Sequence, residues 1–72
     1  MKTATEVRQI INSGGSVILN AKVKTTIELK QIAAEAATRN ITMIIRNAKV
    51  KSTSELRQIA SVAPGKIMFD LT

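Results

Sequence analysis

Apolar residues recur at helical spacing in three separate stretches of this chain. In the first stretch, Val7, Ile10 and Ile11 occupy positions i, i+3 and i+4, which lie on one face of an α-helix. A Thr or Ser precedes the Glu that opens each stretch, and it supplies an N-cap with the Glu in the first turn. The spacing therefore predicts three amphipathic helices, with stripes at Val7, Ile10 and Ile11, at Leu29, Ile32 and Ala33, and at Leu56, Ile59 and Ala60.

A short run of strand-forming residues follows each predicted helix. Helix-breaking segments separate the two kinds of element, namely SGGS at 13–16, TRN at 38–40 and PG at 64–65. Each run then ends in a short polar side chain. The pattern predicts strands over residues 17–20 (VILN), 44–47 (IIRN) and 67–70 (IMFD).

The order of elements repeats because the sequence itself repeats. Residues 20–33 (NAKVKTTIELKQIA) and 47–60 (NAKVKSTSELRQIA) lie 27 positions apart and are identical at eleven of fourteen positions. A weaker copy spans residues 3–11. Because 72 residues allow one domain at most, we expect a single domain of three helix–strand units, about residues 1–22, 23–49 and 50–72.

The alternation of helix and strand also predicts how the strands pair. A helix between successive strands makes a parallel arrangement the simplest one, and right-handed crossovers in sequential strand order put every helix on one face. We therefore expect an α/β fold in which three helix–strand repeats form a short parallel-sheet solenoid. The alternative is an open three-stranded sheet of another strand order, with helices on both faces.

The strand and turn segments VILNAKV and IIRNAKV share one pattern: aliphatic strand residues, then an Asn, then an apolar position before the next helix. In this pattern the chain loosely resembles the leucine-rich repeat family. The resemblance covers the strand and turn of the first two units. The family's Leu-x-Leu pair is not kept, and Asp70 stands in the third unit where the others have Asn. The resemblance implies a solenoid with convex helices and indicates no partner.

Strand alternation assigns the side chains near each turn to two faces. Ile18, Asn20, Lys22 and Lys24 fall on the face away from the helices, whereas Arg46 falls on the apolar side. The alternative is a bend at the Asn that shifts this alternation. The short polar residues at the turns are expected to form a ladder of hydrogen bonds to the backbone of the adjacent unit. This turn ladder consists of Asn20, Asn47 and Asp70.

Composition removes most enzymatic chemistry from consideration. The chain has no cysteine and no histidine, so it lacks thiolate ligands, the commonest metal ligand and the commonest general base. We expect no enzyme activity, no cofactor, no metal and no small-molecule substrate. No apolar run has the length of a signal peptide or a membrane span, so a cytoplasmic protein without membrane contact is the expectation.

The spacing of the repeated glutamates predicts self-assembly. Glu6 and Glu28 are 22 residues apart, Glu28 and Glu55 are 27 apart, and a second copy placed after the first continues the series at 23. We expect head-to-tail docking into a filament or ring. There are two alternatives. The chain is a monomer in which the spacing of 23 arises by chance, or it is a fragment or consensus version of a longer array. The expected self-assembly interface joins Met1, Val7 and Ile10 of one copy to Ile67, Phe69 and Leu71 of another.

Net charge suggests a different function. The chain carries eleven Lys and Arg against five acids, a formal charge of +6. A basic adaptor or regulator that binds nucleic acid or an acidic protein is therefore the rival hypothesis. Phe69 is the only aromatic residue, which argues against base stacking. The expected anion-binding residues are Lys22, Lys24, Lys49 and Lys51.

Overall fold

The computed structural model describes residues 2–72 and contains three α-helices and one three-stranded parallel sheet. Helices and strands alternate along the chain, which confirms the predicted α/β class. A single turn of 3₁₀-helix, η1, follows the second strand. The elements are α1 (Ala4–Asn12), β1 (Ile18–Asn20), α2 (Thr26–Thr38), β2 (Met43–Arg46), η1 (Ala48–Val50), α3 (Thr53–Ser61) and β3 (Ile67–Phe69).

All three helices begin with the same reciprocal pair of hydrogen bonds. At α2 the Thr25 Oγ1 accepts from the Glu28 backbone N–H at 3.1 Å, and the Glu28 Oε1 accepts from the Thr25 backbone N–H at 2.9 Å. Two N–H groups that a helix end leaves unpaired are thereby satisfied. These capping boxes pair Thr3 with Glu6, Thr25 with Glu28 and Ser52 with Glu55.

Between each helix and the next strand lies a residue whose backbone is in the left-handed conformation. The φ angles are +98° at Gly14, +57° at Asn40 and +75° at Gly65. Glycine and asparagine adopt this conformation most readily, so the breakers in the sequence mark real helix ends. After α2, for example, the Ile41 N–H donates to the Ala36 carbonyl at 2.8 Å as the chain turns toward β2.

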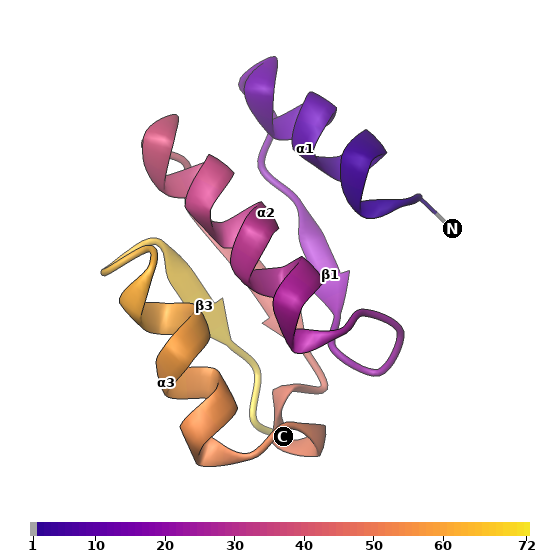
Figure 1. The fold of residues 1–72 in the computed structure, drawn as a ribbon, viewed down its shortest axis with the longest axis vertical. Coiled ribbons are helices and arrows are strands. Elements are labelled where there is room, and N and C mark those ends of the chain that lie inside the picture. The colour runs from indigo at the N-terminus through magenta and orange to yellow at the C-terminus, as the bar shows by residue number, and fades with distance from the viewer. Residues whose placement is uncertain (1) are drawn as a thin grey trace.

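The strands lie in the order β1, β2, β3, and both pairs are parallel. Figure 1 shows the helices as one layer in front of the sheet, with α2 between α1 and α3. The strand order is therefore the sequential one, and the alternative with another order and helices on both faces is wrong. The two ends of the sheet are the outer edges of β1 and β3.

The core fills the space between the helix layer and the sheet. Ile45, at the centre of β2, is fully buried, and so is Leu29 of α2. Small residues of α2, Ala33 and Ala36, are also fully buried, which lets neighbouring elements approach closely. The largest completely buried side chains are Ile11, Leu29, Ile32, Met43, Ile45 and Ile59.

The last turn of α2 has no counterpart in the other two helices. α2 has 13 residues, whereas α1 and α3 have nine each. From this extra turn Glu35 accepts from the Arg8 guanidinium at 3.4 Å, and the next residue after the helix, Arg39, donates to the Asn12 side chain at 2.6 Å. The added length therefore ties α2 to α1.

One residue in the second unit displaces the predicted strand faces. The sequence alignment places Asn20 with Asn47, but in the sheet Asn20 lies beside Arg46. Asn47 has φ 57° and ψ 31°, and the ladder resumes beyond it with the Ala48 N–H donating to the Asp70 carbonyl at 3.1 Å. The assignment of Arg46 to the apolar side is wrong, because Asn47 is an extra left-handed residue that shifts the alternation. Arg46 is exposed.

We expect Ile45→Ala to lower the free energy of unfolding by about 2–5 kcal/mol, because it leaves a cavity at the centre of the core. Ile27→Ala is the matched control, since Ile27 is 68% exposed, and we expect a change within about 0.5 kcal/mol. Urea unfolding followed by circular dichroism measures both. Equal changes for the two variants would contradict the placement of the core.

Candidate functional site

An apolar groove lies at the β1 end of the molecule, between α1 and the first strand. Its volume is about 300 Å³. Val7 is only 4% exposed and forms its floor, whereas Ile10 is 40% exposed. Of the residues expected at this end of the self-assembly interface, Met1 lies outside the described residues. The groove is lined by Lys2, Val7, Ile10, Val17, Ile18, Leu19, Asn20, Val23 and Lys24.

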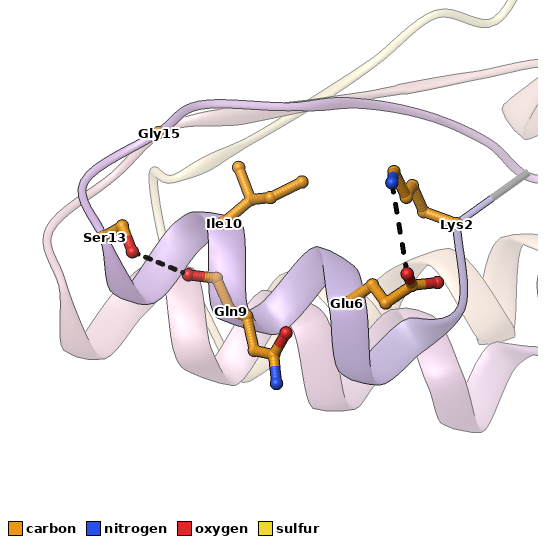
Figure 2. A pocket seen from close by; sticks show the side chains of 6 residues that line it. All are labelled: Lys2, Glu6, Gln9, Ile10, Ser13 and Gly15. Carbon is orange, nitrogen blue, oxygen red and sulfur yellow. Dashed lines mark hydrogen bonds and ion pairs between the residues drawn. The ribbon is translucent and has the colours of Figure 1, made fainter.

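The flank of α1 beside this groove is a shallow depression of about 500 Å³, drawn in Figure 2. Ile10 points from the helix toward the segment that carries Gly15, and a Cβ at Gly15 would approach the Ile10 Cγ2 to 2.9 Å. At the other end of the depression, Lys2 and Glu6 form an ion pair at 4.0 Å. The β1 end therefore presents an apolar side chain next to an exposed carboxylate.

A second apolar groove lies at the opposite, β3 end, between α3 and the last strand. Its volume is about 530 Å³. Phe69 is half-buried in it and Leu71 is 60% exposed, whereas Ile67 packs against the core from β3. The lining is Lys49, Lys51, Thr53, Leu56, Arg57, Ala60, Phe69 and Leu71.

Some of the lining positions of the two grooves correspond in the repeated sequence. Val7 lines the groove at the β1 end, and Leu56, its counterpart in the third unit, lines the groove at the β3 end. Lys2 and Lys51 correspond in the same way. The structure thus separates the predicted interface residues onto two opposite ends of the sheet.

Polar side chains connect each unit to the next inside the molecule. The Thr26 hydroxyl, one residue after the N-cap of α2, donates to Glu55 Oε2 at 2.7 Å. Glu55 Oε1 meanwhile accepts from the Ser52 backbone N–H at 2.9 Å within its capping box. One carboxylate therefore caps its own helix and holds the preceding one. Sequence reasoning missed this bond, although Thr recurs at the same position as Thr53.

The turn ladder contains one direct bond between side chains. Asn47 Nδ2 donates to Asn20 Oδ1 at 2.9 Å, and the same oxygen accepts from the Lys22 backbone N–H at 2.9 Å. Asp70 instead accepts from the backbone N–H of Thr72 at 3.0 Å. Asn20 and Asn47 therefore join the first two units, and Asp70 closes a turn of its own.

The four lysines of the expected anion-binding face lie in different environments. Lys22 and Lys49 are exposed, and Lys51 is half-buried. Lys24 is only 8% exposed, and its Nζ donates to the Lys2 carbonyl at 2.6 Å. The expectation that Lys24 lies on the open face with Lys22 is wrong, because its aliphatic stem is covered and its ammonium group is used inside the protein. Basic charge at the turns therefore comes mainly from Lys22 and Lys49.

Hydrogen bonds at the helix starts lower the pKa of the capping glutamates. For Glu55 the first cause is the donated Ser52 backbone N–H, followed by the Thr26 and Ser52 hydroxyl groups. The pKa of Glu28 is lowered first by the Thr25 backbone N–H. Such bonds favour the charged carboxylate, so these glutamates stabilise the folded state in their ionised form.

No group of three or more potential metal-ligating residues occurs among residues 2–72. Within the same part of the chain, no helix has the length and apolar character needed to cross a membrane. No protein-family model, curated protein or solved structure matches the chain.

We expect the stability of the protein to fall as the pH decreases from about 5 to about 3. Glu6, Glu28 and Glu55 each have a folded-state pKa below the ordinary 4.5, so their contribution is present above that value and is lost as they become protonated. Urea midpoints measured across this range test the expectation. Glu55→Gln removes one of the three carboxylates and makes the dependence shallower; an unchanged profile in that variant would contradict the role of Glu55.

Proposed function

We propose that this protein is a non-catalytic, self-assembling repeat protein whose copies join head to tail as a continued parallel-sheet solenoid. The observation that carries the proposal is the pair of apolar grooves at opposite ends of one sheet, in which Val7 and Leu56 occupy the same repeat position. Such a contact is heterologous, so it generates a filament or a ring. The loose resemblance to leucine-rich repeats agrees with a stack of this kind but indicates no partner.

In this arrangement β1 of one copy adds to the outer edge of β3 of the previous copy. Among the described strands, β3 pairs with β2 alone, so its other edge offers backbone groups to a further strand. The first helix of the added copy then lies beside α3, as α3 lies beside α2. Phe69 and Leu71 of one copy meet Val7 and Ile10 of the next, and both grooves are filled.

The polar contact between the second and third units supplies a template for the junction. Thr53 occupies the position of Thr26, and Glu6 occupies that of Glu55. Glu6 already uses Oε1 in its capping box, where it accepts from the Thr3 backbone N–H at 3.0 Å. Its Oε2 is the atom that corresponds to the acceptor of the Thr26 bond. The Thr53 hydroxyl therefore donates to Glu6 Oε2 of the next copy.

Electrostatics opposes this association at low ionic strength. Every copy carries a formal charge of +6, and the junction brings Lys2 of one copy near Lys51 of the other. Salt weakens such repulsion between exposed charges. The screening length is about 10 Å at 0.1 M salt and about 3 Å at 1 M. Assembly is therefore expected to strengthen as salt increases from low concentration.

The rival function is a small basic adaptor that binds nucleic acid or an acidic protein. The observation that favours it is the exposure of Lys22 and Lys49 in neighbouring turns of a strongly basic chain. Salt distinguishes the two functions, because polyanion binding weakens as salt increases.

We expect Leu71→Lys or Phe69→Lys to abolish assembly, since either variant places a charge in the apolar groove at the β3 end. Light scattering behind size exclusion, over a range of protein concentration, measures the effect, and circular dichroism verifies folding. Ile27→Lys is the control, because Ile27 is equally apolar, is 68% exposed and lines neither groove. A wild-type protein that stays a 7.8 kDa monomer at every concentration would overturn the proposal.

The basic-adaptor hypothesis predicts that changes at the exposed lysines affect polyanion binding and not assembly. Lys22→Glu combined with Lys49→Glu should abolish polyanion binding, and Lys22→Glu alone, at a position outside both grooves, should weaken it and leave assembly intact. Lys24 is not a suitable position for this test, because it is buried and its ammonium group donates to the Lys2 carbonyl, so a change there would also affect the fold. Binding to a short duplex DNA, followed by fluorescence anisotropy, is the measurement.

Thr53→Val is expected to weaken the junction about tenfold, because a hydrogen bond to a charged carboxylate is lost while the shape of the side chain is kept. Thr53→Ser retains the hydroxyl and is expected to retain the affinity. The critical concentration for assembly gives both values. Equal critical concentrations for the Val and Ser variants would exclude the proposed bond to Glu6.

A further inference from the structure

The face of the sheet opposite the helices carries an apolar row, of which Ile18 also borders the groove at the β1 end, whereas Ile44 and Met68 line neither groove. Ile18 of β1, Ile44 of β2 and Met68 of β3 lie directly beside one another. Ile18 is 61% exposed and Met68 is 58% exposed. Parallel sheets are normally covered on both faces, so this row is an unusual surface for a protein in isolation.

Polar residues flank the row in a definite order. Two residues beyond Met68, strand alternation places Asp70 on the same face, and two residues before it, the same rule places Lys66 there. On the central strand the corresponding positions are Arg46 and Thr42, and both are exposed. The third strand therefore carries an acid at one end of the apolar row and a base at the other.

We propose that this sheet face binds the same face of a second copy of the protein. The two copies are related by a twofold axis that runs across the strands, so the facing sheets are antiparallel. Met68 then lies over its counterpart, and Asp70 of each copy faces Lys66 of the other. Two equivalent ion pairs border a continuous apolar contact, which is the self-complementary pattern of an isologous interface.

Charge selects this orientation over the other twofold arrangement. An axis parallel to the strands would place Arg46 directly over the Arg46 of the second copy, an unfavourable contact between like charges. With the axis across the strands, Arg46 faces Thr42 instead. Charge also favours a second copy as the occupant, because the face carries its own acidic group opposite its own basic group.

The size of the face determines when such pairing becomes stable. Three strands about 4.8 Å apart and about five residues long give a footprint of roughly 250 Å². A stable interface buries about 800 Å² per partner, so two isolated copies bind weakly. This inference rests on the proposed function: the twofold axis runs in the direction of head-to-tail growth, so two filaments share it and their contacts add.

The mass per unit length of assembled filaments, measured by scanning transmission electron microscopy, tests the pairing. A single filament contains one 7.8 kDa copy per roughly 14 Å, because each copy contributes three strands. We expect the wild type to have twice that value. Lys66→Glu places two acids opposite each other at both ends of the contact, and we expect it to halve the mass per length while filaments still form.

Two further variants complete the experiment. Lys66→Glu with Asp70→Lys exchanges the charges and is expected to restore doubled filaments. Lys30→Glu changes the net charge equally but lies on α2 in the helix layer and lines neither groove, so its filaments are expected to stay doubled. Single wild-type filaments would overturn the pairing and leave the head-to-tail proposal intact, whereas a monomeric wild type would overturn both. Doubling that appears only with added nucleic acid would assign the face to a polyanion and overturn the pairing.

Discussion

Each helix and strand of this protein buries its apolar side chains against a neighbouring unit, and no unit has enough surface of its own to form a core. The central residues show this dependence most clearly. Ile45 and Leu29, which belong to the middle unit, are completely buried because units lie on both sides of them. At the two ends the same positions line open grooves. The need of each unit for a neighbour therefore explains both the stability of the centre and the apolar character of the ends.

Much of the fold follows from local features of the sequence. Apolar residues at helical spacing indicated three helices, and Thr or Ser before a Glu marked where each helix begins. The glycines and the asparagine that end the helices were visible as breakers. Parallel pairing of the strands followed from the helices between them, since a parallel pair requires a connection of that length, whereas the sequential order was the favoured one of two alternatives.

Other features depend on contacts that the sequence pattern does not contain. Asn20 and Asn47 align in the repeated sequence, yet Asn47 adopts a left-handed conformation and lies outside the strand, so the faces of the second strand shift by one residue. The same shift explains why the sequence pattern did not predict the apolar row of Ile18, Ile44 and Met68 on the open face. The burial of Lys24 was also missed, because a lysine at a turn is normally exposed and only the nearby Lys2 carbonyl explains its position.

Two kinds of surface result from this arrangement, and they differ in chemistry. The ends of the sheet offer backbone edges, apolar grooves and a carboxylate placed to accept a hydrogen bond from a hydroxyl group. The open face offers aliphatic side chains bordered by opposite charges. In the proposed assembly the ends would bind by continuing the sheet and the face by being covered, and Ile18 is the residue that the groove at the β1 end and the apolar row share. Charge would act differently on the two proposed contacts, since joining the ends would bring lysines together and pairing the faces would bring Lys66 to Asp70.

The additional turn of α2 gives every molecule a visible landmark. Helices of nine residues flank one of 13, and the extra turn is held in place by the bonds from Arg8 and Arg39. In a stack of many copies this turn would extend α2 along its axis by one turn more than its neighbours, once for every three helices. The longer helix would then recur with the period of one whole molecule. An image of the array would therefore show where one chain ends and the next begins, and in which direction the chains run.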